Sequence, residues 1–361
     1  MDFSQLLSLV ALALVASQVA EAAPPPKVTC ADGNVTANAV CCQLFSAVAI
    51  LQENLFDGAQ CGEEAHSALR LSFHDAIGFS IHGMQGLSGG GADGSILVFN
   101  ATELKFHANI GIDDITSEQF PVFQTTNLSA GDFVHLAAAV GTANCPGAPQ
   151  LDFFFGRAPP VAPAPDLTVP EPTDSVDAII ERFADAGFSV DEIVALLSSH
   201  TVAAADEIDT TIPGTPFDTT PFTFDTQFFV ETLLKGSLFP GNGSQAGEVL
   251  SPIHGEMRLQ SDFELSRDPR TACLWQAMIN DQTRMQTQFK AAMHKLELLG
   301  QPDTLVDCSD VIPVPAPFKG QAVFPATFSR RDIQQACLLE PFPTLQTLPG
   351  PETSVPPVPG S

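Results

Sequence analysis

The chain has 361 residues, among them 42 acidic and 15 basic side chains, 30 prolines and 8 cysteines. A chain of this length can bury a large core, which excludes a small scaffold held together mainly by disulfides. Its formal charge of −27 disfavours binding to nucleic acid or to anionic membranes, because like charges repel.

The N-terminal segment has the pattern of a targeting signal. An apolar run over residues 6–20 is too short to span a bilayer, and a small-residue pattern follows at residues 20–22. We expect a signal peptide over residues 1–22, a short pro-piece over residues 23–27 and a secreted mature chain from Val28. No later stretch is apolar enough to span a membrane.

Beyond Val28 the dominant pattern is helical, since apolar residues recur every three or four positions. This periodicity predicts helices over residues 39–55, 62–77, 129–142, 173–186, 190–205, 225–234 and 270–299. Strand alternation is scarce, so the predicted fold class is mainly α. Ser189 and Glu192 form a capping-box pattern that opens the helix carrying His200.

A proline-rich stretch over residues 157–172 separates two helical halves. Because this stretch is too short for a flexible tether, we expect two lobes that share one central site, over about residues 28–170 and 171–340. The last segment, residues 341–361, contains proline so often that we expect it to be extended rather than helical.

All eight cysteines follow the expected cleavage point, and an even number in a secreted chain favours four disulfides. The residues alone leave their pairing open. Asn-X-Ser/Thr sequons are compatible with glycosylation of surface loops, and they occur at Asn34, Asn100, Asn127 and Asn242.

Arg70 and His74 lie at positions i and i+4 of one predicted helix, so a fixed cation and a titratable base project from the same face. A neutral imidazole can take a proton from one oxygen of a peroxide and return it to the other. A guanidinium can stabilise the charge that develops meanwhile. The alternative for these two residues alone is a surface arginine and a structural histidine, which is the commoner state of histidine.

Oxygen donors follow both His74 and His200. The first set is Asp75, Gly91 through its carbonyl, Asp93 and Ser95. The second set is Thr201, Asp218, Thr220, Thr223 through its carbonyl, and Asp225. Because Ca²⁺ takes about six to eight oxygen ligands, these sets predict two calcium sites. The alternative is a glycine-rich turn with ordinary solvated acids.

Several segments together carry a specific resemblance: Arg70 to Asp75, Gly91 to Ser95, Phe106 to Asn109, Ser199 to Asp206 and Pro356 to Ser361. In them the chain resembles the fungal secreted class II haem peroxidases, the group of lignin, manganese, versatile and generic peroxidases. The resemblance covers essentially the whole mature chain. It implies a two-lobed helical haem peroxidase fold, with haem between the lobes, two calcium ions and four disulfides. The implied disulfides are Cys30–Cys42, Cys41–Cys308, Cys61–Cys145 and Cys273–Cys337.

On the distal side of the haem, the resemblance makes Arg70 and His74 the pair that reacts with H₂O₂. It implies that Asn109 holds the tautomer of His74 and that Glu103 supports Asn109. Phe73 would pack over the distal haem face, although core packing accounts equally well for this residue.

On the proximal side, the resemblance makes His200 the iron ligand, with Asp262 accepting a hydrogen bond from its other ring nitrogen. Phe217 would pack near the proximal face, and Glu171, between two prolines, would line the access channel. No Cys-x-x-Cys-His motif occurs, so we expect one haem b held without covalent links. We expect the remaining histidines to be surface or structural residues; they are His66, His82, His107, His135, His254 and His294.

Manganese oxidation in the family uses three carboxylates beside a haem propionate. Glu63, Ser67 and Asp206 occupy the corresponding positions, so a serine stands where a second glutamate is expected. Two carboxylates, the propionate and a hydroxyl or water can still bind Mn²⁺, which prefers hard oxygen donors, but more weakly. The alternative is a pair of ordinary solvated acids.

A second route in the family transfers electrons from bulky aromatics through an exposed tryptophan five residues before the proximal histidine. That position is Ala195 here. The one tryptophan, Trp275, is two residues from Cys273 and is expected to be buried, and the chain has no tyrosine. We therefore predict no lignin-peroxidase or versatile-peroxidase activity of the usual kind.

The sequence thus predicts a secreted, monomeric, H₂O₂-dependent haem peroxidase that oxidises Mn²⁺, small phenols at the haem edge, or both, in the breakdown of lignin or aromatics. One alternative is a generic low-potential phenol peroxidase that does not oxidise Mn²⁺. An alternative of another class is a non-catalytic, calcium-binding secreted glycoprotein. The last is disfavoured because every catalytic position is filled.

Overall fold

The computed structural model describes residues 27–83, 90–236 and 244–360. The expected signal peptide, nearly all of the pro-piece and the sequon at Asn242 lie outside these ranges, so the corresponding predictions stay predictions. None of the described helices combines the length and the apolar character needed to cross a bilayer.

The fold is mainly α, as predicted. The first half contains the 3-10 helix η1 (Ala39–Gln43), α2 (Leu44–Asn54), α3 (Glu63–Ala76), α4 (Ser95–Val98), α5 (Asn100–Glu103), the 3-10 helix η2 (His107–Asn109), α6 (Ile112–Phe123) and α7 (Ala130–Ala143). The second half contains α8 (Val176–Asp185), α9 (Val190–Leu196), the 3-10 helix η3 (Leu197–Val202), α10 (Gln227–Glu231), α11 (Gln260–Leu265), α12 (Ala272–Met278) and α13 (Gln282–Glu297). Short 3-10 helices follow at η4 (Ser309–Val311) and η5 (Arg330–Asp332).

The strands are short and form two-stranded sheets. The antiparallel pairs are β1 (Val28–Thr29) with β2 (Val35–Thr36), β3 (Phe154–Phe155) with β8 (Val306–Asp307), β4 (Ala204–Ala205) with β5 (Thr215–Pro216), and β6 (Glu248–Leu250) with β7 (Met257–Leu259). One pair is parallel, β9 (Val323–Phe324) with β10 (Gln346–Thr347).

Every segment predicted to be helical contains a helix. Some predicted boundaries were wrong, and one segment predicted as a single helix is two. The predicted helix over residues 270–299 is two helices, α12 and α13, because Asn280 between them adopts the left-handed conformation with φ 58°. The helix predicted over residues 190–205 ends at Val202, since Ala203 is extended and leads into β4. Helix α6 was not predicted; it contains Pro121, which ordinarily signals a helix end.

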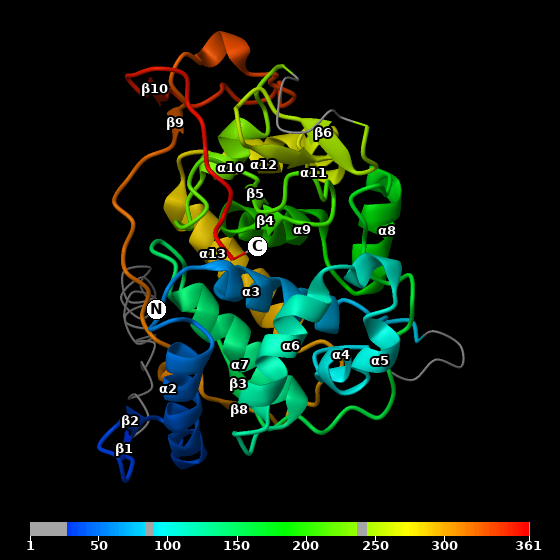
Figure 1. Ribbon diagram of the computed structural model, residues 1–361, viewed down its shortest axis with the longest axis vertical. Helices are drawn as coiled ribbons and strands as arrows, with labels where there is room; N and C mark the ends of the chain where they lie inside the picture. Colours follow the sequence, from blue (N-terminus) through cyan, green and yellow to red (C-terminus); the bar gives the residue numbers. More distant parts are fainter. Residues whose placement is uncertain (1–26, 84–89, 237–243, 361) are drawn as a thin grey trace, which may run out of the picture.

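The helices gather into two groups with the catalytic elements between them. In Figure 1, α2 to α7 lie in the lower part of the molecule, α8 to α12 lie in the upper part, and α13 runs between. Helix α3 packs mainly against α7 and also contacts η3, while α13 packs against α9 and α3. The elements that carry His74 and His200 are therefore neighbours.

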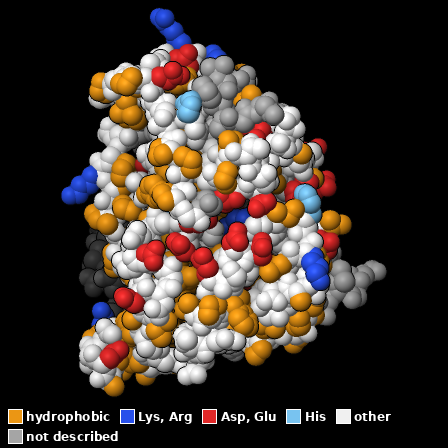
Figure 2. Space-filling model, viewed as in Figure 1, with side chains coloured by type: hydrophobic (Ala, Val, Ile, Leu, Met, Phe, Trp, Pro, Cys, Tyr) orange, Lys and Arg blue, Asp and Glu red, His pale blue; other side chains and the backbone are white. Residues whose placement is uncertain are grey.

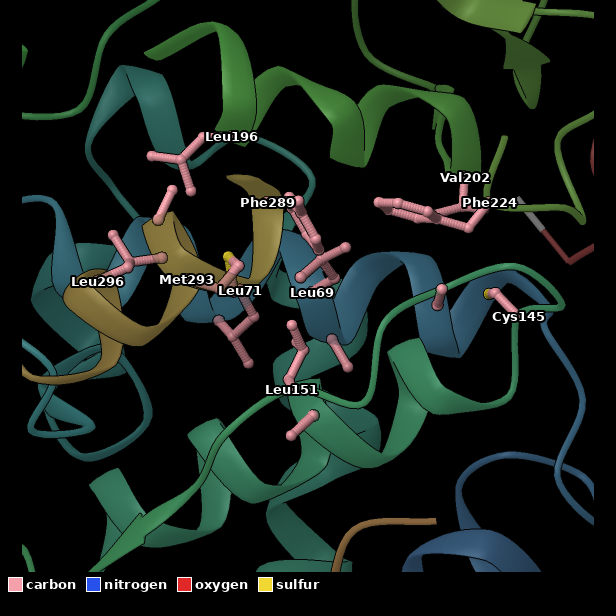
Figure 3. Close-up of a cluster of buried hydrophobic side chains, with 14 of the residues drawn as sticks. Leu69, Leu71, Cys145, Leu151, Leu196, Val202, Phe224, Phe289, Met293 and Leu296 are labelled. Carbon is pink, nitrogen blue, oxygen red and sulfur yellow. The ribbon is translucent and has the colours of Figure 1, made fainter. Parts of the chain in front are cut away.

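A continuous apolar core fixes these helices against each other. Figure 3 shows Leu69 and Leu71 of α3 among Phe289 and Met293 of α13, with Leu196 of α9 nearby. Leu71 and Phe289 are fully buried. Each such side chain contributes about 1.5 to 3 kcal/mol by leaving water, so the core holds the orientation of α3 firmly.

Four disulfides use all eight cysteines. They are Cys30–Cys42, Cys41–Cys308, Cys61–Cys145 and Cys273–Cys337, the pairs that the family resemblance implies. The bond between Cys41 and Cys308 spans 267 residues and joins the first helices to the segment after α13. After Pro341 the described chain contains no helix and returns along the upper group, as Figure 1 shows.

Candidate active site

Helix α3 presents Arg70 and His74 on one side. The helix begins after Gly62, and Glu63 and Glu64 in its first turn are favourable at the positive end of the helix dipole. Leu71 on another side is fully buried in the core. Because this apolar side is fixed, the side with Arg70 and His74 is fixed as well.

His74 is held in one tautomer. Its Nδ1 donates to Oδ1 of Asn109 at 2.8 Å, so Nε2 is left as the acceptor. Burial and the charge of Arg70 together lower the pKa of His74 to about 3, against the opposing effect of the hydrogen bond with Asn109. The imidazole is therefore neutral, which is the form that can accept a proton.

Asn109 is itself held by Glu103. Its Nδ2 donates to the main-chain carbonyl of Glu103 at 2.9 Å. The Glu103 carboxylate instead accepts from the backbone N–H of Ala164 at 3.0 Å, and burial raises its pKa to about 7. The support of Asn109 by Glu103 that the resemblance implies is thus present, and it comes from the backbone carbonyl of Glu103.

Arg70 is exposed to solvent on one side, although protein atoms crowd it from the other sides. Its Nη2 donates to the carbonyl of Ile110 at 2.9 Å. This crowding lowers the pKa of Arg70, while the negative charges of Asp206, Glu63 and Glu207 raise it. A guanidinium stays charged despite such a shift, so Arg70 provides a fixed positive charge one helical turn from His74.

His200 lies on η3, directly after α9. Helix α9 begins with the predicted capping box, in which the Ser189 N–H donates to the Glu192 carboxylate at 2.7 Å. His200 Nδ1 donates to Oδ2 of buried Asp262 at 2.9 Å, the contact that the resemblance implies. Among the residues that the structure describes, none is hydrogen-bonded to the other ring nitrogen, and the side chain is 25% exposed. Nε2 is therefore available as an iron ligand.

The aromatic surroundings also suit a flat, apolar cofactor. The ring of Phe217 lies 5.4 Å from that of His200, and the ring of Phe73 lies 6.0 Å from that of His74. Two further rings were not predicted: Phe183 lies 5.8 Å from Phe73, and Phe228 lies 5.6 Å from His200. Both occur in predicted helices, where an apolar periodic position does not distinguish a cofactor contact from the core.

The first predicted calcium set contains a buried carboxylate and an unsatisfied oxygen. Asp75 is fully buried, and this burial raises its pKa to about 7. It accepts from the Gly94 N–H at 2.9 Å and from His135 at 3.2 Å. The buried hydroxyl of Ser95 has no hydrogen-bond partner among the described residues. A hard cation would satisfy these oxygens, so they fit the expected calcium ion.

The rest of this set follows within a tight turn. Asp93 accepts from the Ser95 N–H at 3.0 Å, and the carbonyl of Gly91 accepts from the Asp93 N–H at 2.8 Å. Gly94 has φ 78°, and a Cβ there would lie 2.3 Å from the backbone of Ala130. Only glycine allows this approach, which fixes the turn against the start of α7.

The second set contains two buried carboxylates close together. Burial and mutual repulsion raise the pKa of Asp218, and burial raises that of Asp225. Thr201 Oγ1 donates to Asp218 at 2.6 Å and also reaches the Thr223 carbonyl at 3.4 Å, while Thr220 Oγ1 donates to Asp225 at 3.2 Å. Two adjacent buried carboxylates need a positive charge, and their donor chemistry fits Ca²⁺.

Acidic side chains lie around Arg70. Ser67 Oγ donates to Glu63 at 2.6 Å, one turn along α3, and Asp206 accepts from the Gly214 N–H at 2.8 Å. The carboxylates of Glu63 and Asp206 both raise the pKa of Arg70, so both lie near its guanidinium. We call the surface formed by Glu63, Ser67 and Asp206 beside Arg70 the Glu63 rim. Figure 2 shows acidic side chains gathered around a basic one near the middle of this face.

Glu207 is a further acid at this rim that the sequence did not reveal as part of the site. It raises the pKa of Arg70, and its Cγ would lie 3.0 Å from a Cβ placed on Gly111. The signal that could have found it is its position directly after Asp206. The end of the chain borders the same rim, since a Cβ on Gly360 would lie 3.6 Å from Cβ of Glu63.

Glu171 contacts the first helical group. Its Oε2 lies 2.7 Å from Nδ1 of His107, which is exposed and belongs to the same 3-10 helix as Asn109. The expectation that His107 is a surface residue is confirmed. His66 is buried and lies 3.6 Å from the sulfur of Cys61. The group of Cys61, His66 and Cys145 is close enough to hold a metal, but the disulfide leaves no thiolate to bind one.

The aromatic positions agree with the sequence. Trp275 is fully buried and donates from Nε1 to the carbonyl of Phe229 at 3.1 Å. Ala195, five residues before His200, is also buried. Neither position offers an exposed ring.

Two family models cover nearly all of the described chain. One, described as "Peroxidase", matches residues 46–281, and one described as "Fungal peroxidase extension region" matches residues 284–360. The chain is 55% identical to manganese peroxidase 3 of Phlebia radiata over 366 residues, which covers 100% of both chains. It is 54% identical to versatile peroxidase VPS1 of Pleurotus eryngii over 340 residues, 93% of this chain and 92% of that protein. It is 49% identical to ligninase B of Phanerodontia chrysosporium over 372 residues, 100% of both.

The helical fold and these matches define an enzyme that is a peroxidase. Within that class, the chain belongs to the family of fungal class II peroxidases, whose cofactor is haem. The family resemblance found in the sequence is thereby confirmed. The roles of individual residues remain proposals, supported by the geometry above.

Proposed function

We propose that the protein is a secreted haem peroxidase in which H₂O₂ is cleaved between Arg70 and His74 and the reductant is Mn²⁺ at the Glu63 rim. The observation that carries this proposal is the His200–Asp262 contact, because it leaves one imidazole nitrogen free to bind iron. His200 would hold the haem, with Phe73 and Phe217 against its faces. When bound, haem supplies the redox chemistry that reduces peroxide and oxidises the reductant.

His74 moves the proton. Its neutral Nε2 would accept a proton from one oxygen of the peroxide and return it to the other, which would leave as water. Asn109 keeps Nδ1 protonated, so that Nε2 remains the acceptor. Arg70 stabilises the negative charge that develops on the departing oxygen.

Asp262 acts through His200. A carboxylate that accepts from Nδ1 fixes the ring orientation and makes Nε2 a stronger donor to the metal. We expect Asp262→Asn to retain haem but to react with H₂O₂ about 10- to 100-fold more slowly, the usual cost of losing such a partner. The measurement is the rate of the absorbance change on mixing with H₂O₂. The matched control is Glu264→Gln on the same helix, which should leave this rate unchanged, and equal rates for the two variants would contradict the role of Asp262.

The reductant site rests on Glu63, Ser67 and Asp206. Two carboxylates and a hydroxyl on one rim suit Mn²⁺, and the neighbouring charge of Glu207 adds to the attraction. Steady-state turnover with H₂O₂ in a chelating acidic buffer tests this proposal, with Mn²⁺ and a small phenol assayed in parallel. Turnover of the phenol alone would instead favour a generic peroxidase that works at the haem edge near Glu171.

We propose that Ca²⁺ binds both buried oxygen sets. Chelation should then lower the unfolding temperature, since a ligand present at a hundred times its Kd contributes about 2.7 kcal/mol for each site. The measurement is calorimetry with excess Ca²⁺, with EGTA, and with EGTA followed by Ca²⁺. Unfolding temperatures that do not respond to EGTA would contradict both sites. Mg²⁺ serves as the control ion and should restore little, because it demands a smaller octahedral site.

The remaining features fit an extracellular enzyme. We propose cleavage of the signal peptide and pro-piece, glycosylation at one or more sequons, and a monomeric mature chain divided into lobes over residues 28–170 and 171–340 with the tail 341–361. Four disulfides and the acidic charge support this proposal. The non-catalytic alternative has no support, because all the residues that the proposed peroxide cleavage needs are present.

A further inference from the structure

Two glutamates meet inside the second helical group, away from the residues of the proposed mechanism. Glu231 is the last residue of α10, and Glu256 directly precedes β7. Both are 0% exposed. A buried carboxylate is costly unless donors satisfy it, so each oxygen of this pair needs a partner.

Both carboxylate oxygens of Glu231 accept hydrogen bonds. Its Oε1 accepts from Thr219 Oγ1 and from Gln227 Nε2, each at 2.7 Å. Its Oε2 accepts from the Thr219 N–H at 2.8 Å. These bonds hold Thr219 by both its backbone and its side chain, and Thr219 lies between Asp218 and Thr220.

Glu256 lacks a donor on one side. Its Oε1 accepts from Ser251 Oγ at 2.8 Å, but among the described residues no donor reaches its buried Oε2. The side chain that it meets is Glu231, with which it is within hydrogen-bonding reach. Two carboxylate oxygens in contact repel unless one of them carries a proton.

We propose that Glu256 is a neutral carboxylic acid that donates its proton to Glu231, and that this shared proton fastens the β6–β7 hairpin to the loop over residues 218–225. The hydrogen bond between the two side chains is then present in acid and is lost as the pH rises and Glu256 releases its proton. Because it needs neither haem nor Mn²⁺, this inference is independent of the proposed function.

The charges around Glu256 agree with a bound proton. Burial raises its pKa well above the ordinary value of 4.5, and Glu231 on α10 raises it further. Arg258 on β7 lowers the pKa of Glu256. Its guanidinium, however, donates its hydrogen bonds to backbone carbonyls, including that of Leu234 at 2.6 Å. Ser251 also opposes the shift, through the hydrogen bond from its hydroxyl. Asp218 and Asp225 interact with Glu231 and not directly with Glu256, and the Ca²⁺ proposed to bind them would offset their charge.

The sign of the pH effect follows from these shifts. The folded state keeps a proton that the unfolded chain releases near pH 4.5, so the folded state binds more protons above that pH. The contribution of the pair is therefore complete below about pH 4.5 and is lost as the pH rises toward the raised pKa of Glu256. The enzyme is stabilised on the acidic side.

The test uses the full haem-loaded chain with excess Ca²⁺, and compares the parent with Glu256→Gln. A glutamine donates to Glu231 and accepts from Ser251 without a titrating proton. Above pH 4.5 the unfolding constant of the parent should rise about tenfold more per pH unit than that of E256Q, measured by guanidinium titration with the disulfides intact. Glu264→Gln is the matched control and should keep the slope of the parent.

A direct readout complements the titration. The infrared spectrum of the parent at neutral pH should show the band of a protonated carboxylic acid, and E256Q should lose that intensity. Parallel pH curves for the parent and E256Q, or an unchanged infrared band, would overturn the proposal. If E256Q does not fold, Ser251→Ala is tested in its place. Removing this donor to Glu256 should raise the pH at which the stabilisation is lost, and an unchanged pH would overturn the proposal.

Discussion

Replacing His74 by leucine should slow the reaction with H₂O₂ by about 10²- to 10⁴-fold, the usual contribution of a positioned acid–base group. The reason is geometric: Nε2 of His74 is the buried acceptor that Asn109 keeps free of a proton. Leucine fills similar space in the core but cannot carry the proton between the two peroxide oxygens. Stopped-flow absorbance after mixing with H₂O₂ measures the rate.

The control for this variant is His82→Gln, since His82 is exposed and has no part in the proposed site. It should react like the parent. Asn109→Leu should give an intermediate rate, because His74 remains but its tautomer is no longer fixed. If His74→Leu reacts as fast as His82→Gln, with haem retained in both, then the proton passes through another group and the assignment is wrong.

The double variant Glu63→Ala with Asp206→Ala should lose oxidation of Mn²⁺ by about 10²- to 10⁴-fold in kcat/KM. A contact with a charged group contributes about 1.5 to 3 kcal/mol, and two such ligands are removed together. Oxidation of a small phenol should stay close to that of the parent, because the phenol needs only the haem edge. Steady-state rates with both reductants measure the split.

Ser67→Glu provides the opposite variant. A third carboxylate one turn from Glu63 should lower the KM for Mn²⁺ and leave phenol oxidation unchanged. Equal loss of both activities in the double variant would mean that it damages Arg70 and not a metal site, since both acids act on that guanidinium. If the parent itself is inert toward Mn²⁺, the enzyme is a generic peroxidase.

The sequence predicted the mainly α class and the helix that bears Arg70 and His74, because their signals are local. Apolar periodicity, the capping box at Ser189 and the spacing of Arg70 from His74 all depend on residues a few positions apart. The break at Asn280 was missed, since a single residue in a left-handed conformation leaves the apolar period on both sides intact. Helix α6 was missed because proline in its last turn resembles a stop signal.

The site could be predicted only as far as the family motifs reach. The contact between His200 and Asp262 joins residues 62 positions apart, and nothing in their own neighbourhoods indicates it. That the support of Asn109 comes from the main-chain carbonyl of Glu103 is likewise visible only in the folded chain. The pair of Glu231 and Glu256 carries no motif, and only the folded chain brings the two side chains together.

The disulfide between Cys41 and Cys308 has a consequence for the response of the chain to proteolysis. Any single peptide bond cut between these two residues leaves two fragments that are still one covalent molecule. The fragments remain held by the shared core around α3 and α13, so a nicked molecule can keep its active site. A single cut by a protease between these residues therefore does not separate the fragments, and the nick would appear on a gel only after reduction.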